Sequence, residues 1–284
     1  MPSFSKVTEI LEQVITEASQ TALKYFKDET DLGIRTKQHR TDIVTKADIE
    51  VQNLIQNSIF REMVKAGFVE SEIGFLGEEG LVKPGKYIFL IDPIDGTKNF
   101  ISRFDIFGIA VCVFIDTQPL AGIISAPAYQ KIYIAEKNKG AWLQHKSELV
   151  QLQTKPCDLG NAVVNFDINS NIPEMKGVRE SMISVLSPLV RTIRMVGSST
   201  LETCWVVENI FNFAIFGRQK AWDIAAGKLI LEEADGAMVD WSGMNFDVDP
   251  FDPDRRYFAV AANKQSIHQI LPYLDITSLN KIFD

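Results

Sequence analysis

The stretch LIDPIDGTKNF, residues 90–100, carries an apolar segment straight into two aspartates that lie three positions apart. Pro93 fixes its own φ and favours an extended backbone at Asp92, so the strand is expected to stop and turn within DPID. Gly96 permits a tight bend, and Thr97 can cap a following helix through its hydroxyl. The stretch therefore predicts a strand, a turn with two carboxylates and a helix, although an ordinary turn uses the same residue types.

Other acidic side chains stand at the ends of elements that are otherwise apolar. Glu78 and Glu79 lie between turn formers in GEEG, Asp223 lies at the head of an Ala-rich helix, and Asp48 lies at the beginning of another helix. Carboxylates that converge repel one another and have raised pKa values unless a cation lies between them. Magnesium binds carboxylates, carbonyls and water, and bound metal ions let an acidic protein hold a phosphate. The acidic positions together predict a divalent metal site that handles phosphate.

Hydrophobic periodicity divides the chain into elements. Apolar side chains between residues 7 and 26 recur at helical spacing, and a second helix is expected to start near Asp48. Between residues 87 and 144, short β-rich runs separated by turn residues predict an antiparallel meander. In the second half we expect strands at 161–166, 191–197, 212–217 and 237–241, and helices at 173–190, 199–211 and 221–236.

This alternation predicts a layered α+β architecture. We expect an N-terminal half, residues 1–150, that carries the antiparallel sheet and most metal ligands. A C-terminal half of α/β type, residues 151–284, is expected to complete the active site. Because the sequence shows no repeats or flexible linkers around residues 145–160, the two halves are expected to pack into one compact unit.

Composition excludes several classes of protein. The net charge of −8 and the pI near 5.1 argue against a nucleic-acid-binding surface, which needs clustered Lys and Arg. The three cysteines, odd in number and far apart, indicate reduced thiols in a cytoplasmic protein. The longest apolar run, residues 106–115, is too short to span a bilayer, so no membrane partner is expected. The three histidines show no metal-ligand spacing, which argues against zinc.

Three motifs in order, GEE, DPIDGT-x-NF and WDIAAG, resemble the inositol monophosphatase family of magnesium-dependent, lithium-sensitive phosphatases. The resemblance covers nearly the whole chain, from the first helix through the strand after Gly236. It implies a layered α-β-α-β-α sandwich of two packed subdomains, with the active site in the cleft between the halves. It also implies a homodimer and about two to three Mg²⁺ ions per site.

The resemblance implies a set of metal ligands at numbered positions of this chain. One ion is expected to be bound by Glu78, Asp92 and the backbone carbonyl of Ile94. A second ion is expected to be bound by Asp92, Asp95 and Asp223, so that Asp92 bridges the two. Glu78 is also expected to hold a weaker third ion through waters.

The resemblance further implies a catalytic group of Thr97, Asp48 and Glu78. In this group Thr97, oriented by Asp48, positions and deprotonates the water that attacks the phosphate, which is a general-base role. Lys37 lies in a loop that closes over the metals in the family. Plainer alternatives exist, because Asp48 and Thr97 can each simply cap a helix. Glu79 can be an acidic residue of a turn that does not bind the metal, and Lys37 can be an ordinary solvent-exposed lysine.

The substrate site implied by the resemblance takes residues from both halves. Its expected members are Asp95, Gly96, Thr97, Gly197, Ser198, Ser199 and Asp223. The backbone N–H groups of Gly96 and Thr97 are expected to hold phosphate oxygens at a helix start. The segment around Gly197 is expected to offer N–H and hydroxyl groups to a polyol.

One position departs from the inositol-handling members of the family. Seven residues before the aspartate of WD, those members carry a glutamate that binds a ring hydroxyl, and this chain has Phe216 there. A phenyl ring cannot accept that hydrogen bond, and an unmet hydroxyl weakens binding. Arg218 and Lys220 nearby are candidates to meet a second phosphate or a carboxylate, or are ordinary surface charges.

We therefore expect a Mg²⁺-dependent phosphomonoesterase, a phosphoric monoester hydrolase that uses a metal-activated water on a small phosphorylated metabolite similar to an inositol phosphate. Alternatives within the family are a fructose-1,6-bisphosphatase, an adenosine 3′,5′-bisphosphate phosphatase and a histidinol phosphate phosphatase. A different class is a phosphate-binding regulatory scaffold without turnover. A magnesium-dependent kinase is not expected, because the chain has no GxxxxGK[ST] loop.

Overall fold

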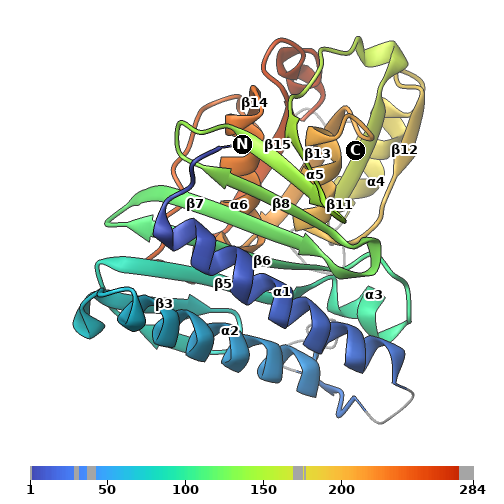
Figure 1. Cartoon of the computed structure of the whole chain (residues 1–284). Helices are drawn as coiled ribbons and strands as arrows, with labels where there is room; N and C mark the ends of the chain where they lie inside the picture. The colour runs from blue at the N-terminus through green and yellow to red at the C-terminus, as the bar shows by residue number, and fades with distance from the viewer. Residues whose placement is uncertain (1, 29–31, 37–42, 169–174, 176, 275–284) are drawn as a thin grey trace.

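The structure is a computed structural model that describes residues 2–28, 32–36, 43–168, 175 and 177–274. Figure 1 shows two packed sheets with helices between and around them. The strands of the larger sheet are, in spatial order, β10 (Glu148–Leu152), β9 (Ala141–His145), β8 (Lys131–Glu136), β7 (Gln118–Ala126), β6 (Gly108–Ile115), β5 (Tyr87–Asp95), β3 (Ile73–Gly77) and β4 (Leu81–Lys83). Those of the smaller sheet are β12 (Thr192–Arg194), β11 (Val163–Ile168), β13 (Phe213–Gln219), β15 (Tyr257–Asn263) and β14 (Gly236–Asp240). A short hairpin pairs β1 (Arg35–Thr36) with β2 (Ile43–Val44).

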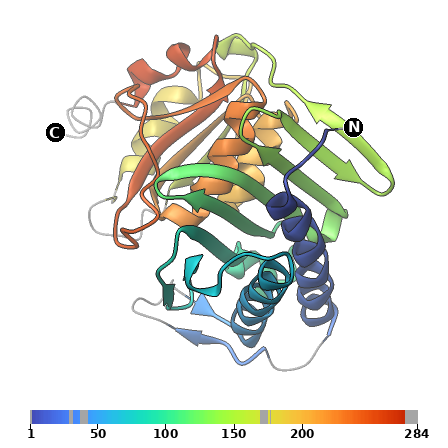
Figure 2. The same ribbon diagram turned by 60° about the vertical axis from the view of Figure 1, so that its left-hand side comes forward.

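Helices cover the sheets in three layers, which Figure 2 shows from a second direction. The outer pair α1 (Lys6–Lys27) and α2 (Lys46–Lys65) packs on the larger sheet. The inner pair α5 (Ser199–Val207) and α6 (Ala221–Glu233) lies between the two sheets, and α4 (Val178–Leu186) packs on the far face of the smaller sheet. The short helix α3 (Thr97–Ile101) follows β5. This order confirms the expected α-β-α-β-α layering.

The first layer forms because α1 presents one apolar face. Its buried side chains recur at helical spacing and pack with those of α2 and the larger sheet in one core cluster. Ser5 caps the helix, and its side chain accepts a hydrogen bond from the Thr8 N–H at 3.5 Å. No helix in the described part of the chain is long and apolar enough to cross a membrane.

The middle layer depends on small residues, because α6 is packed between two sheets. The helix is buried almost all round, as a helix with apolar residues on every face should be. At Gly122 of β7, an added Cβ would lie 3.1 Å from the backbone of Ala226. The glycine and the alanine therefore let α6 approach the sheet closely, which places the head of α6 at the end of β5.

β5 ends at Asp95, the last residue of DPID, so the strand stops where it was expected to. It does not turn at Pro93, however, but runs through it, and its register with β6 shifts between Asp92 and Asp95. The ladder therefore bulges where the proline cannot donate a hydrogen bond, and the bulge turns the two aspartates before Gly96 begins the helix.

The antiparallel meander is confirmed, since β5 to β9 pair consecutively and antiparallel. The three helices predicted for the second half are all too long at their C-terminal ends. α6 ends at Glu233, and residue 236, predicted as its end, is the first residue of β14. α4 ends at Leu186, shortly before Pro188, which disfavours helix at the residue before it. α5 ends at Val207, and Asn209 adopts a φ of 63° just beyond. The parallel pairing of β3 with β5 and the strand β15 were both absent from the prediction.

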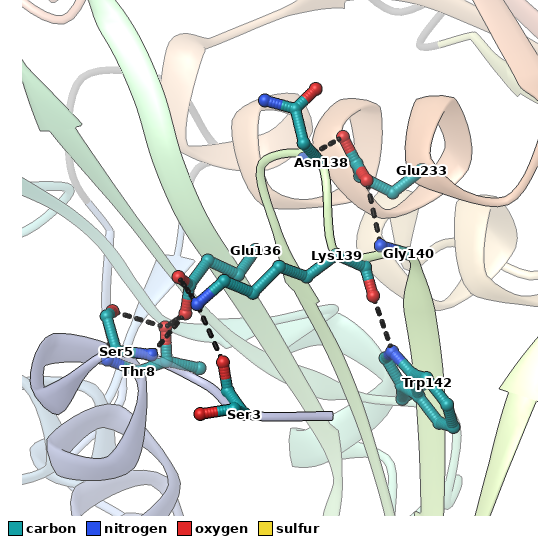
Figure 3. A network of polar contacts seen from close by, with 9 residues as sticks. All are labelled: Ser3, Ser5, Thr8, Glu136, Asn138, Lys139, Gly140, Trp142 and Glu233. Atoms are coloured by element: carbon teal, nitrogen blue, oxygen red, sulfur yellow. Dashed lines mark hydrogen bonds and ion pairs between the residues drawn. The ribbon is translucent and has the colours of Figure 1, made fainter. Parts of the chain in front are cut away.

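Polar contacts at the N-terminal end of α1 connect three layers of the fold (Figure 3). Glu136 of β8 accepts hydrogen bonds from the Ser5 N–H at 2.7 Å and from Thr8 Oγ1 at 2.6 Å, and pairs with Lys139 at 2.6 Å. The turn that carries Lys139 is held to α6, because Glu233 accepts from the N–H groups of residues 138 and 140 at 2.9 Å each. Burial opposes ionisation of Glu136, but the bonds from Lys139, Thr8 and Ser5 outweigh it and lower its pKa.

Glu136→Ala is expected to lower the free energy of unfolding by about 2 kcal/mol, because it removes a charged acceptor and leaves the Ser5 N–H without its partner. Chemical denaturation measures the change. Glu148→Ala, on the exposed edge strand β10, is the matched control and should change stability by less than about 0.5 kcal/mol. Equal effects of the two substitutions would contradict a tying role for Glu136.

Candidate active site

Asp92 lies among carboxyl groups that the fold gathers from distant parts of the chain. Its side chain is 1% exposed, and its Oδ1 has no hydrogen-bond partner among the residues that the structure describes. Burial raises the pKa of Asp92 well above its usual range. Neighbouring negative charges raise that pKa further, and in decreasing order of effect they belong to Glu78, Asp95, Asp223 and Asp48. Five predicted site acids are thus electrostatic neighbours.

The start of α5 holds the carboxylate of Asp95. Oδ2 of Asp95 accepts hydrogen bonds from Ser198 Oγ at 2.6 Å, from Thr200 Oγ1 at 2.6 Å and from the Thr200 N–H at 2.8 Å. Oδ1 accepts a longer bond of 3.3 Å from Ser199 Oγ. Burial raises the pKa of Asp95, and the bonds from Ser198 and Thr200 oppose that rise. Ser198 and Ser199 therefore contact a predicted metal ligand.

Asp223 lies in the first turn of α6, where a carboxylate is favoured by the helix dipole. Its Oδ2 accepts a hydrogen bond of 2.7 Å from the Lys220 N–H. Burial and the charge of Glu78 raise the pKa of Asp223, while the Lys220 N–H opposes the rise. The ammonium of Lys220 lies 4.8 Å from the ring centre of Trp222, a cation–π distance. Lys220 thus places a positive charge beside this acid.

Asp48 and Thr97 meet although 49 positions separate them, since Thr97 Oγ1 lies 3.3 Å from Asp48 Oδ1. The Thr97 hydroxyl has a second acceptor, the Ile94 carbonyl, at 3.0 Å. Oδ2 of Asp48 accepts from Thr45 N–H at 2.8 Å and from Thr45 Oγ1 at 2.5 Å, which closes a capping box on α2. Asp48 therefore both caps its helix and reaches Thr97. Thr97 does not cap α3, because Gly96 is the cap residue and no side chain caps that helix.

Gly96 joins the two halves of the site through its backbone. Its φ is 86°, and an added Cβ would lie 3.0 Å from the Ile106 carbonyl and 3.1 Å from the Gly197 carbonyl. The side chain of Asn99 donates to the Val196 carbonyl at 2.7 Å and to the Ile106 carbonyl at 2.8 Å. The α3 turn is thus fastened to the turn before α5.

Three residues with a role here were not singled out from the sequence. They are Asn99, Thr200 and Glu202, and Glu202 accepts from the Gly197 N–H at 2.9 Å. Asn99 belongs to the DPIDGT-x-NF motif but was assigned no role from it, and Thr200 looks like an ordinary helix-start residue in sequence. Glu202 did carry a signal, because a fully buried acid inside the apolar helix STLETCWVV is costly unless it binds something.

The donor set fits a divalent cation in its chemistry. As the side chains stand, no three or more His, Cys, Asp or Glu of the described residues form a group that could hold a metal ion directly. The same carboxyl groups nevertheless raise the pKa of Asp92, whose Oδ1 is buried without a partner. A cation between them would supply that partner and cancel the repulsion, and oxygen ligands of this kind suit Mg²⁺.

Some predicted positions lie elsewhere or outside the described chain. Lys37 lies outside the described residues. Phe216 is fully buried in the core between the sheets and exposes no surface to a ligand. Arg218 is half-buried at the end of β13 and has a φ of 62°. Glu79 has its N–H bonded to Gln52 Oε1 at 3.0 Å, as a turn acid would.

The sequence profile of the inositol monophosphatase family matches residues 3–277. The chain belongs to the inositol monophosphatase family.

Characterised members of the inositol monophosphatase family share about a quarter of their residues with this chain. A fructose-1,6-bisphosphatase/inositol-1-monophosphatase of Thermotoga maritima is 29% identical over 218 residues, which cover 74% of this chain and 76% of the relative. Inositol monophosphatase 2 of Rattus norvegicus is 27% identical over 243 residues, which cover 84% and 81%.

Solved structures of the inositol monophosphatase family have the same fold. The suhB protein of Bartonella henselae superposes with a TM-score of 0.82 at 22% identity, covering 96% of this chain and 99% of that one. An inositol monophosphatase/NADP phosphatase complexed with Mg²⁺ and phosphate superposes with a TM-score of 0.76 at 21% identity, covering 96% and 97%. At such identities the likeness shows the fold alone.

In this member of the inositol monophosphatase family, cavity size does not identify the site. An open hollow of ≈ 390 Å³ lies between Trp241, Phe246, Tyr257 and Phe258, and no predicted site residue lines it. The candidate site is marked instead by buried carboxyl groups with raised pKa values, which cluster at functional sites.

Proposed function

We propose that this protein is a Mg²⁺-dependent phosphomonoesterase that hydrolyses a small phosphorylated metabolite. The observation that carries the proposal is the buried Asp92 carboxyl, unpartnered at Oδ1 among the described residues and flanked by the charges of Glu78, Asp95 and Asp223. Such a cluster is unfavourable in isolation and becomes favourable when cations bind. Membership of a family whose characterised relatives are phosphatases supports the same function.

The metal site in this proposal takes its ligands from three elements. Asp92, Asp95 and the carbonyl of Ile94 come from the bulged end of β5, Glu78 comes from the turn after β3, and Asp223 comes from the head of α6. Two or three bound Mg²⁺ ions would cancel the repulsion among these carboxylates and hold the phosphate. They would also lower the pKa of a bound water, and about two ions are enough for an in-line displacement. The parallel pairing of β3 with β5 keeps Glu78 beside Asp92, since Gly77 pairs with Ile91.

Thr97 and Asp48 are proposed to hold the attacking water and to take its proton. The Thr97 hydroxyl has one proton and two acceptors within reach, so when it donates to Asp48 its lone pairs can accept a proton of the water. Asp48 is fully buried and anchored by Thr45, which keeps its Oδ1 directed at Thr97. A fixed acceptor of this kind is what general-base catalysis requires.

The phosphate is proposed to rest on the backbone of Gly96 and Thr97, with the turn at Gly197, Ser198 and Ser199 facing the alcohol part of the substrate. The close approach of Gly96 to the Gly197 carbonyl, where a Cβ would lie at 3.1 Å, supports a single site built from both halves. Inositol phosphates, fructose 1,6-bisphosphate and adenosine 3′,5′-bisphosphate are the candidate substrates. The homodimer implied by the resemblance and the cytoplasmic location indicated by the cysteines belong to this proposal as well.

A phosphate-release screen tests the function. Purified protein with Mg²⁺ should release phosphate from at least one of myo-inositol 1-phosphate, fructose 1,6-bisphosphate, adenosine 3′,5′-bisphosphate and histidinol phosphate, and chelation with EDTA should stop the release. Release that persists in EDTA would contradict a metal-dependent reaction. If metal binds and no substrate is turned over, a phosphate-binding scaffold would replace the enzyme as the better account.

A further inference from the structure

The buried face of α2 carries polar side chains at two positions one turn apart, Asp48 and Gln52. Asp48 is fully buried and Gln52 is 4% exposed, whereas most other buried positions of the helix are apolar. Residues four positions apart lie on the same face of a helix, and α2 packs on β3 and β5. Because a buried amide is costly without partners, Gln52 is expected to bind a specific group there.

The side chain of Gln52 binds the backbone of Glu79. Its Oε1 accepts a hydrogen bond from the Glu79 N–H at 3.0 Å, and its Nε2 donates to the Glu79 carbonyl in a longer contact of 3.5 Å. A carboxamide has an acceptor oxygen and a donor nitrogen, so it can meet both backbone groups of a single residue. Gln52 therefore connects α2 with the turn that follows β3, directly beside Glu78.

Gly77, the last residue of β3, leaves the space that the Gln52 amide occupies. A Cβ added to Gly77 would lie 2.3 Å from Gln52 Oε1 and 2.8 Å from Gln52 Cδ, so a side chain at this position would displace the amide. Gly77 does not have a positive φ, so its backbone conformation does not require glycine. A glycine inside a strand often marks the close approach of another group, and here that group is the Gln52 side chain. The sequence thus provides both the amide and the space for it.

Glu78 lies between two backbone anchors. Its own N–H donates to the Ile91 carbonyl of β5 at 3.2 Å, and the N–H of the next residue is held by Gln52. After burial itself, the charge of Glu78 is the largest cause of the raised pKa of both Asp92 and Asp223. The position of Glu78 therefore governs the electrostatics of the proposed metal site, and Gln52 holds that position from the side of α2.

We infer that Gln52 is a positioning residue for the metal site, which holds the Glu78 turn against α2 and thereby sets the affinity for Mg²⁺. The inference rests on the proposed function and concerns the same site. A residue that fixes a metal ligand from behind changes metal affinity without touching the ion. Because Asp48 lies one turn earlier on the same helix, α2 also keeps the proposed acceptor of the water's proton in a fixed arrangement with the Glu78 turn.

Calorimetric titration of the whole protein with Mg²⁺ tests the inference. Gln52→Met keeps an unbranched, buried side chain and removes both amide atoms. It should raise the Kd for Mg²⁺ by about 10- to 100-fold, the usual result of removing such a support. In the phosphate-release assay, its kcat at limiting Mg²⁺ should fall. Saturating Mg²⁺ should restore kcat to within about threefold of the wild type, and the KM for the substrate should change little.

Two further variants sharpen the test. Gln56→Met makes the same change one turn further along α2, at a half-buried position, and should bind Mg²⁺ as the wild type does. Gln52→Glu keeps an oxygen that can accept from the Glu79 N–H, and its added negative charge favours a cation. It should therefore bind Mg²⁺ at least as tightly as the wild type. Weaker binding by Gln52→Glu would contradict the inference, even if Gln52→Met failed to fold.

The outcomes separate the inference from the proposed function. If Gln52→Met bound Mg²⁺ as tightly as the wild type, or if Gln56→Met lost as much affinity, the inference would be wrong and the function would stand. A loss of kcat that saturating Mg²⁺ did not restore would also overturn the inference, because Gln52 would then have a general structural role. If the wild type bound no Mg²⁺, the proposed function would fail, and the inference with it.

Discussion

Asp92→Asn is expected to lower kcat/KM for every substrate by about 10³-fold or more. The substitution removes the carboxylate that is proposed to bridge two ions, and metal ions contribute several kcal/mol to transition-state stabilisation in such reactions, which corresponds to this loss of rate. Asparagine keeps the size and shape of the side chain, so packing around β5 should not change. Phosphate release at saturating Mg²⁺ measures the loss.

The same substitution has an opposite effect on the metal-free protein. Because Asp92 lies buried among the charges of Glu78, Asp95 and Asp223, removing its charge relieves repulsion. The variant in EDTA should therefore melt at the same temperature as the wild type or above it, whereas the stabilisation that Mg²⁺ gives to the wild type should disappear. Melting curves with and without Mg²⁺ record both effects. If the variant melted at a lower temperature than the wild type in EDTA, Asp92 would have a structural role, and the result would contradict its assignment as a metal ligand.

Thr97→Val should reduce kcat by about 10² to 10⁴-fold, the range that a positioned general base contributes. Valine has the shape of threonine without the hydroxyl, so the variant removes the contacts of that hydroxyl with Asp48 Oδ1 at 3.3 Å and with the Ile94 carbonyl at 3.0 Å and preserves the packing. KM should change little, since the hydroxyl is proposed to act on the water rather than on the substrate.

Thr97→Ser is the matched control for this prediction, because it restores the hydroxyl and loses only a methyl group. It should retain most of the wild-type kcat. If valine and serine were equally active, the hydroxyl would have no part in the reaction, and the contact with Asp48 would be a structural link between α3 and α2. Such a result would leave the metal proposal intact.

Local sequence signals predicted the elements that depend on local physics. The helical spacing of apolar residues in α1 and the short β-rich runs of β5 to β9 are each readable within one element, and the structure confirms both. The DPID stretch shows the limit, since a proline and a glycine indicated a turn, but pairing with β6 carries the strand through Pro93 as a bulge. Pairing with β6 outweighed the local preference.

Contacts within the candidate site were less predictable. The pairing of Thr200 with Asp95 spans 105 positions and that of Asn99 with Val196 spans 97, and neither follows from the residue types alone. Hydroxyl and amide side chains can equally well form hydrogen bonds with water. Only the packing of α5 against the end of β5 gives these side chains a partner within the protein. Glu202 belongs to the same class, because its burial and its bond to the Gly197 N–H arise only when α5 packs in the folded chain.

The sequence by itself determined that this chain carries carboxylates at the ends of apolar elements in an order typical of one family, and hence that cations and phosphate are its chemistry. That much follows because charge and hydrophobicity are properties of single residues. Only the tertiary structure decided which acids lie around Asp92, and that Asp48 bonds with both Thr45 and Thr97. The physical reason is that a carboxylate's energy depends on its burial and its neighbours, and both are set by the packing of elements far apart in the chain.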